Sequence, residues 1–196
     1  MGRPSKEKSL TQKDVINAAI ACLDKEGESA VGVNRVAREL GIKPPAIYKH
    51  LDGNAALRRA VALTIWRQYV EWCRQQTEGL DNPRVLLQVG GRATRNFARS
   101  YPNRYRIMTQ FQLSPNDPET APLIQEIFNF LKRVLQSYAL SDTKLIDAMR
   151  IVNAAITGFI AIEQAGLMTL ERSPDASYEV MLDALLVAIQ HIQQNK

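Results

Sequence analysis

The sequence predicts an all-α protein of about nine helices, and three observations lead to this fold class. Apolar residues recur every three or four positions along nearly the whole chain, which is the period of an amphipathic helix. The strict alternation of apolar and polar residues that marks a half-buried strand is absent. Four expected helix starts contain a proline, whose missing N–H is no loss in a first helical turn: Pro83, Pro102, Pro122 and Pro174.

The first expected helix has a signal at each end. Thr11 can cap its start, with Asp14 three residues later as the second member of a capping box. Apolar residues at 16, 19, 20 and 23 mark one buried face, and Gly27 is placed to end the helix.

Two short helices follow, separated by a glycine turn. The first is expected from about Val33 to Leu40, ending at Gly41, where a positive φ suits glycine. The second opens at Pro44 and runs through Leu51. This is the shape of a helix-turn-helix, in which the first helix braces on the DNA backbone and the second enters the major groove.

The rest of the chain predicts a longer helical body. Asn54 can cap a fourth helix that runs to about Thr77, roughly 36 Å, long enough to connect two domains. Five further helices are expected at about 83–100, 102–113, 120–139, 142–168 and 174–194. We therefore expect an N-terminal helix-turn-helix domain at 1–54 and a separate C-terminal helical domain at 55–196.

Composition and charge favour a soluble protein with a polyanionic partner. Hydrophobic residues make up 45% of the 196 residues, and the net charge is +5. Most of that charge lies in residues 1–60, although many solvated surfaces are also basic. Cys22 and Cys73 lack metal-ligand spacing and favour a reducing compartment. The apolar stretch 151–162 is too short to span a bilayer, so we expect a cytoplasmic protein with no metal, cofactor or membrane association.

The run VARELGIKPPAIYKHL, from Val36 to Leu51 and followed by Leu57, carries a specific resemblance. It is similar to the signature of the TetR (tetracycline repressor) family of bacterial transcription regulators. The resemblance implies that residues opening the second short helix contact base edges, while Tyr48 and His50 contact phosphates and Asn34 matches a further contact position. The candidate DNA-binding residues are Arg3, Asn34, Lys43, Pro44, Pro45, Ala46, Tyr48, Lys49, His50 and Asn54.

The resemblance has departures. Asn54 stands where the family usually has a lysine that contacts phosphate, so one charge contact is lost. Ala46 replaces the usual threonine or serine, which favours an apolar contact with a thymine methyl group. The basic stretch around Arg3 resembles arms that enter the minor groove, and it equally suits a solubilising tail.

Two helical stripes suit pairing with a second copy of the chain. Small residues line the eighth expected helix at Ala154, Gly158, Ala161 and Ala165. Larger apolar residues of the ninth, including Leu182, Leu185, Ile189 and Ile192, follow the spacing of helices that pack at a shallow angle. The family resemblance implies a four-helix dimer interface here, whereas packing within one chain is the alternative.

The middle of the chain is rich in aromatic and methionine residues, most of which suit the core. The candidate effector contacts are Tyr69, Arg95, Tyr105, Met108, Phe128 and Asn153. Arg92, Arg95 and Arg99 share one helical face, which suits an anionic or hydrogen-bonding effector or else a solvated basic surface. Glu163, in an otherwise apolar helix, is expected to pair with one of these arginines.

An enzyme is disfavoured because the two histidines, His50 and His191, have no catalytic or metal-binding spacing and no phosphate-binding loop follows a strand. We expect a ligand-responsive regulator, a repressor by the resemblance, that binds a palindromic operator as a homodimer in the bacterial cytoplasm. The alternative is a helical interaction module, or a degenerate regulator that no longer binds DNA.

Overall fold

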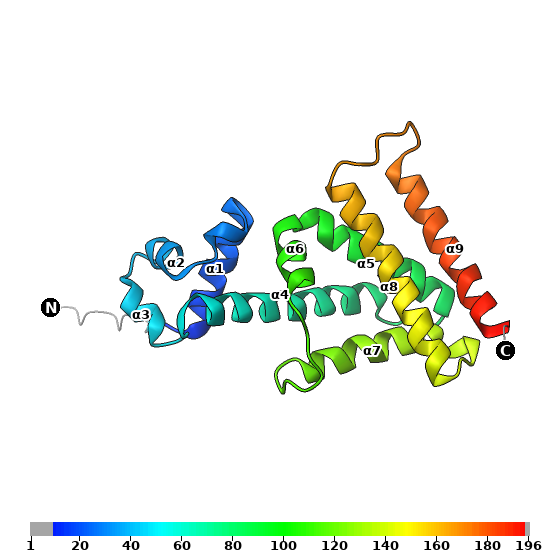
Figure 1. Cartoon of the computed structure of the whole chain (residues 1–196), viewed down its shortest axis with the longest axis horizontal. Helices are drawn as coiled ribbons and strands as arrows, with labels where there is room; N and C mark the ends of the chain where they lie inside the picture. Colours follow the sequence, from blue (N-terminus) through cyan, green and yellow to red (C-terminus); the bar gives the residue numbers. More distant parts are fainter. Residues whose placement is uncertain (1–9, 195–196) are drawn as a thin grey trace. The chain divides into compact units, whose positions relative to one another are not determined.

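The computed structural model describes residues 10–194, and this range is all helical, which confirms the predicted fold class (Figure 1). It contains nine α-helices and two short 3₁₀-helices, with no strand among the described residues. The α-helices are α1 (Gln12–Glu26), α2 (Val33–Glu39), α3 (Pro44–Tyr48), α4 (Gly53–Thr77), α5 (Pro83–Ser100), α6 (Pro102–Gln110), α7 (Ala121–Leu135), α8 (Asp142–Gln164) and α9 (Pro174–Gln194). The 3₁₀-helices are η1 (Glu28–Ala30) and η2 (Gln136–Tyr138).

The chain divides into two compact units, and the division falls inside α4. The first unit takes the chain up to Trp66 together with Asn103–Phe111, so α6 belongs with the N-terminal helices. The second takes residues 67–102 and everything after Phe111. The sequence predicted a boundary between residues 54 and 55, where the DNA-binding part was expected to end. That functional division stays a prediction.

The first unit has a core of aliphatic side chains from α1, α2 and α3. Val15 and Leu23 of α1, Val36 of α2 and Ile47 of α3 are all fully buried. The capping box predicted for α1 is present: the Asp14 amide donates to Thr11 Oγ1 at 3.2 Å, and the Thr11 amide donates to Asp14 Oδ2 at 2.9 Å.

In this unit α6 is attached to α1 by polar contacts. The Asn103 side-chain amide donates to the Leu23 carbonyl at 3.1 Å, and Arg104 pairs with Asp24 at 2.6 Å. Because the Leu23 carbonyl lies near the end of α1, these contacts fix α6 against that end of the helix.

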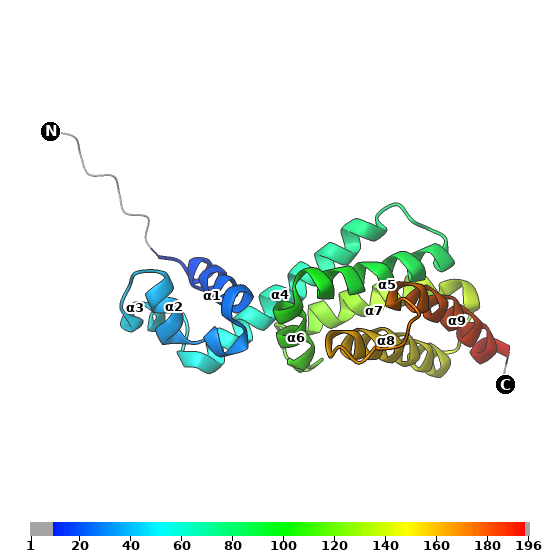
Figure 2. The same ribbon diagram turned by 90° about the horizontal axis from the view of Figure 1, so that it is seen from above.

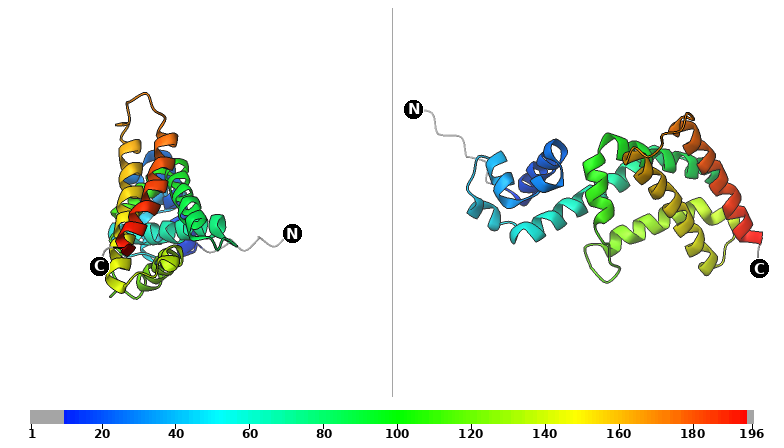
Figure 3. Two further views of the ribbon diagram at one scale, coloured as in Figure 1. Left: turned by 90° about the vertical axis from the view of Figure 1, so that its right-hand side faces the viewer. Right: turned by 45° about the horizontal axis from the view of Figure 1, so that its top comes forward.

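The second unit packs α5, α7, α8 and α9 with the C-terminal part of α4. In Figures 1, 2 and 3, α8 and α9 lie side by side and run in opposite directions. At Gly91, α5 and α9 approach so closely that an added Cβ would lie 2.6 Å from Leu182 Cδ2. The absent side chain therefore lets Leu182 pack directly on the backbone of α5.

Several helices end earlier than the sequence pattern predicted. α6 ends at Gln110 rather than near 113, before Ser114, which precedes a proline and is thereby disfavoured in helix. α8 ends at Gln164 rather than 168, because Gly166 takes a positive φ of 69° and terminates it. The expected helix 120–139 is divided into α7 and η2.

α8 is the one helix of residues 10–194 that is long and apolar enough to cross a membrane by length and composition alone. A core helix of a soluble protein passes the same test. Both cysteines are buried and free. Burial raises the pKa of the Cys73 thiol to about 11, so this thiol is protonated at neutral pH.

Candidate functional site

The helix-turn-helix is formed by α2, a tight turn and α3. Gly41 has a φ of 67°, as predicted for the turn. The Ile42 amide donates to the Ala37 carbonyl at 3.0 Å and the Gly41 amide to the Arg38 carbonyl at 3.2 Å. These two bonds form a Schellman motif, which stops α2 and turns the chain into α3.

α3 is anchored by one face and exposed on the other. Ile47 is fully buried and Leu51, just beyond the helix, is 7% exposed, whereas Tyr48 is 55% exposed. The helix has only five residues and ends at Tyr48, so the predicted continuation through Leu51 is wrong and Lys49 and His50 lie in the following turn. Of the other predicted contact residues, Asn34, Lys43, Pro45, Lys49 and Asn54 are exposed, and Pro44, Ala46 and His50 are half-buried. Arg3 lies outside the described residues.

Asn54 has a role that the sequence did not reveal. The expected cap of α4 is wrong, because α4 already begins at Gly53. Instead, Asn54 Oδ1 accepts a hydrogen bond of 2.8 Å from the backbone amide of Val33. Val33 opens α2, whose own N-cap residue is Gly32 and makes no side-chain cap bond. Asn54 therefore caps α2 from the first turn of α4 and joins the two helices.

The charged residues near α2 divide into a paired and an unpaired set. Arg35 pairs with Glu26 and, at 2.8 Å, with Glu39, which also pairs with Lys25 at 3.2 Å. Hydrogen bonding to Arg35 lowers the pKa of both glutamates. By contrast, Arg38, Lys43 and Lys49 form no ion pair with any residue of the described chain, which leaves three cations on this surface for an external anion.

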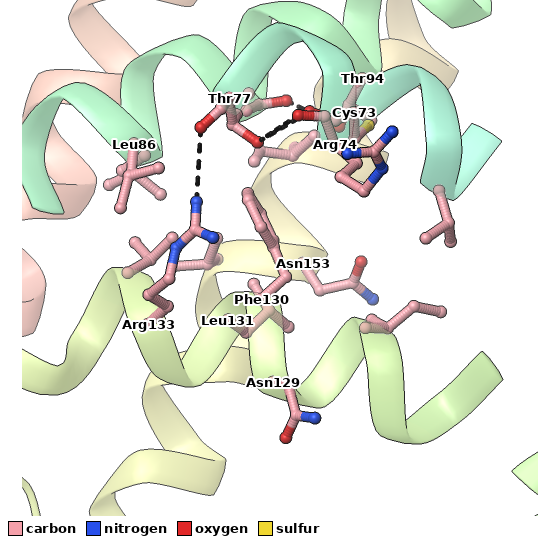
Figure 4. Close-up of a pocket in the computed structure, with 18 of the residues that line it drawn as sticks. Cys73, Arg74, Thr77, Leu86, Thr94, Asn129, Phe130, Leu131, Arg133 and Asn153 are labelled. Atoms are coloured by element: carbon pink, nitrogen blue, oxygen red, sulfur yellow. Dashed lines mark hydrogen bonds between the residues drawn. The ribbon is translucent and has the colours of Figure 1, made fainter. Parts of the chain in front are cut away.

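The second unit contains a cavity of about 350 Å³ (Figure 4). It lies among the C-terminal part of α4 and helices α5, α7 and α8, and most of its wall is apolar. The wall includes Tyr69, Cys73, Thr77, Leu86, Gly90, Thr94, Phe130, Arg133, Val134, Asn153 and Ile156. A space of this size can hold a small organic molecule.

Hydrogen bonds fix the polar groups at the cavity wall. Tyr69 Oη and Thr94 Oγ1 are 3.0 Å apart, and Thr94 Oγ1 also donates to the Gly90 carbonyl at 2.9 Å. Across the cavity, Arg133 of α7 donates to the Thr77 carbonyl at 3.4 Å, a contact drawn in Figure 4.

The cavity contains two of the six effector residues expected from the sequence, Tyr69 and Asn153. Tyr105 and Met108 are buried in the first unit and do not line it, which corrects their expected placement. Phe128 is also absent from the wall, where Phe130 of the same helix stands instead.

Arg133, Thr94 and Gly90 were not predicted as cavity residues. Gly90 carried a usable signal, since a glycine within an amphipathic helix often marks a close approach. Here an added Cβ would lie 2.9 Å from the Phe130 ring.

Arg95 faces a carboxylate of the protein itself and does not line this cavity. Its side chain is 6% exposed and lies 2.5 Å from Glu163, whose side chain is 15% exposed. Its guanidinium also lies over the rings of Phe159 and Tyr178, at 5.3 and 4.6 Å from their centroids. The predicted pairing of Glu163 with an arginine is confirmed. Hydrogen bonding to Arg95 lowers the pKa of Glu163, and Arg99 adds to this effect.

The two stripes proposed for dimerisation differ in exposure. Ala154 and Ala161 on α8 and Ala165, the residue that follows its end, are exposed, and Gly158 is half-exposed. On α9, however, the residues Leu182, Leu185 and Ile189 are at most 5% exposed within the single chain, and Ile192 is half-buried. The first three pack inside their own chain and cannot form the surface expected of them. The exposed apolar residues of these helices are instead Ile146, Ile151 and Ile162 on α8, and Val180 and Val187 on α9.

The first unit has a helix-turn-helix whose α3 is anchored by buried Ile47 and exposed on its other face, and the second unit is helical and contains a cavity. These features define a ligand-responsive DNA-binding regulator. Residues 15–61 match the family described as "Bacterial regulatory proteins, tetR family", and residues 87–185 match "Tetracyclin repressor-like, C-terminal domain". The second match covers half of the chain, and the protein belongs to the TetR family of transcriptional regulators. Members of this family typically act as homodimeric repressors and are generally not enzymes.

Known proteins similar to this chain include regulators and solved structures. A relative from Mycobacterium tuberculosis, the uncharacterized HTH-type transcriptional regulator Rv0681, is 29% identical over 86% of this chain and 75% of its own. BioQ of Mycobacterium smegmatis is 26% identical, with a TM-score of 0.68 over 93% of this chain and 99% of its own. A variant of TetR from Acinetobacter baumannii AYE, solved in complex with minocycline, is 22% identical, with a TM-score of 0.73 over 95% of this chain and 99% of its own.

Proposed function

We propose that this regulator is a repressor that binds a palindromic operator as a homodimer and responds to a small molecule in its helical cavity. The observation that carries the DNA-binding part is the exposed face of α3. Ile47 holds the helix from within, and Tyr48 and two unpaired lysines, Lys43 and Lys49, surround its outer side.

In this proposal the two ends of α3 have different tasks. Lys43, Pro44, Pro45 and Ala46 open the helix and meet base edges, with the Ala46 methyl group against a thymine methyl. Tyr48, Lys49, His50, Asn34 and the amide of Asn54 contact the backbone and set the register. Arg3 is proposed to enter the minor groove.

The dimer is proposed to form through the exposed faces of α8 and α9. Ile151 is 40%, Ile162 is 48% and Val187 is 65% exposed in the single chain, next to exposed alanines that allow close helix approach. Two-fold symmetry would place two α3 helices in major grooves about 34 Å apart, which requires a palindromic site. A dimer would also cover the apolar side of α8, which favours a cytoplasmic location over a membrane one.

The effector is proposed to occupy the cavity of the second unit. Two features support this site: its apolar wall with a few polar groups, and the contribution of α4, which also belongs to the DNA-reading unit. The minocycline bound to the Acinetobacter baumannii TetR variant, a protein of the same fold, is consistent with a ligand-binding role for this unit.

The test is selection of bound sequences from random duplex DNA by the full-length protein at two salt concentrations. An enriched palindrome with affinity that falls steeply with salt supports the proposal, because phosphate contacts release counterions. His50→Ala is expected to weaken binding to all sequences alike, whereas Ala46→Ser changes base preference. Absence of enrichment at either salt, with the protein shown to be folded, favours an interaction module that does not bind DNA.

A further inference from the structure

Three charged side chains line the cavity, and their partners differ. Arg74 lies 2.7 Å from Glu71 and 3.5 Å from Glu78, both outside the wall. Its pKa is raised, first by hydrogen bonding to Glu71 and also by attraction to Glu78 and to Glu126. Glu126 is the acidic residue of the wall, and it attracts Arg74 more weakly than Glu71 does.

Arg133 is the remaining charge of the wall, and it has no acidic partner within residues 10–194. Within the described residues its guanidinium donates to the Thr77 carbonyl at 3.4 Å, which is long for an N–H to oxygen bond. A carboxylate, sulfonate or phosphate would be a stronger acceptor, because hydrogen bonds between two charged groups are roughly twice as strong as neutral ones. The guanidinium therefore has capacity for an anion that the protein does not supply.

The position of Arg133 suits a ligand with an apolar body. Its Cζ lies 6.0 Å from the centroid of the Phe130 ring, and Figure 4 shows both side chains extending from α7 toward the cavity. Phe130 in turn contacts Gly90 on the opposite helix. An anion bound to Arg133 would thus have its attached hydrocarbon directed along Phe130 into the apolar interior.

Part of the cavity wall is polar but uncharged. Tyr69 and Thr94 provide hydroxyl groups there, and burial keeps the Cys73 thiol protonated. Arg133 is therefore a cation without an acidic partner among residues 10–194, in the wall of a mostly apolar space.

We propose that the cavity selects a small apolar molecule that carries one anionic group, and that Arg133 binds this group. This inference rests on the proposed function, since it takes the cavity to be the effector site. It also assigns a response: an anion that engages Arg133 competes with the Thr77 carbonyl and loosens the contact between α7 and the C-terminal end of α4.

The test uses two fluorescent probes that differ only in charge. N-phenyl-1-naphthylamine is neutral, and 1-anilinonaphthalene-8-sulfonate has the same ring system with one sulfonate. Each is titrated into the full-length protein and into three variants. In Arg133→Gln the anionic probe is expected to bind about tenfold or more weakly, whereas the affinity for the neutral probe changes less than twofold. Arg74→Gln, the matched control, is expected to leave the preference between probes unchanged.

A third variant shows whether the probes occupy the cavity at all. Asn153 lies at the wall and is exposed, so Asn153→Trp can fill the space without a buried clash, and a melting curve checks that it folds. Loss of both probes in this variant supports the cavity as the binding site. If both probes bind it undiminished, the effector site itself is refuted. If Asn153→Trp excludes both probes but Arg133→Gln binds the anionic one as wild type, only the anionic class is refuted.

Discussion

The buried ion pair between Arg95 and Glu163 should contribute more to stability than any exposed pair of the second unit. Glu163→Gln removes the charge that compensates Arg95, whose side chain is 6% exposed. Breaking a buried pair on one side typically costs about 3–5 kcal/mol. Asp175 remains 3.0 Å from Arg95 but is 67% exposed, so it compensates the guanidinium only in part. We expect a loss of about 2–3 kcal/mol, which corresponds to roughly 5–10 °C in Tm for a protein of this size.

The control is a pair with the same chemistry at the surface. Arg92 and Glu179 also lie 2.5 Å apart, but their side chains are 46% and 45% exposed. Glu179→Gln should therefore cost less than about 1 kcal/mol. Thermal unfolding followed by circular dichroism at pH 7 measures both variants. Equal losses in the two variants would refute the argument that burial determines the strength of this pair.

The same pair predicts how stability depends on pH. The pKa of Glu163 is lowered in the folded protein, first by its hydrogen bond with Arg95. A depressed carboxyl pKa stabilises the fold above the unfolded pKa of about 4.3, and this contribution disappears as the pH falls through the folded pKa. The Tm difference between wild type and Glu163→Gln should thus be largest near neutrality and shrink below about pH 4. A difference that stays constant down to acid pH would contradict the assignment.

Three further predictions follow from packing and exposure. Asn54→Ala should destabilise the protein by about 1 kcal/mol through loss of the α2 cap, whereas Asn54→Asp keeps the acceptor and its stability; equal loss in both, measured by urea unfolding, contradicts a capping role. Gly91→Ala should lower the free energy of unfolding by about 1–2 kcal/mol, because its Cβ would lie 2.6 Å from Leu182 Cδ2. An unchanged Tm in this variant would show that α9 can move to accommodate the methyl group. Val187→Glu should convert the proposed dimer to monomer in sedimentation, because Val187 is 65% exposed on α9; a dimer that persists at micromolar concentration places the interface elsewhere.

Local signals in the sequence were sufficient for much of the fold. The expected ranges 83–100 and 174–194 coincide with α5 and α9, because a proline opens each helix and fixes its start. The capping box at Thr11 and the turn at Gly41 are equally local and were confirmed. The end of α8 was missed although Gly166 marks it, since the apolar period continues past the glycine.

The sequence often predicted the role of a residue correctly but not the element that the residue contacts. Asn54 does cap a helix, but it caps α2, which lies 21 residues earlier in the chain. The stripe of Leu182 and Ile189 is buried, but α5 contributes to its burial through Gly91 rather than a second copy of the chain. Helical periodicity identifies a buried face, and it contains no information on which neighbour covers that face.

The sequence likewise identified arginines that could bind an anion, but it did not show which of them has a carboxylate partner within the protein. Arg92, Arg95 and Arg99 were expected to suit an anionic effector; in the structure, both Arg95 and Arg133 lie over aromatic rings. A buried guanidinium needs a permanent anion, because its desolvation would otherwise cost several kcal/mol. Arg95 is buried and has Glu163 for this purpose, so its charge is already compensated within the protein. Arg133 is exposed to solvent and has no acidic partner among residues 10–194, so it can exchange water and the Thr77 carbonyl for a ligand at little cost. Burial therefore explains why Arg95 has a permanent partner, and it agrees with the proposal that Arg133 is the arginine that binds the effector.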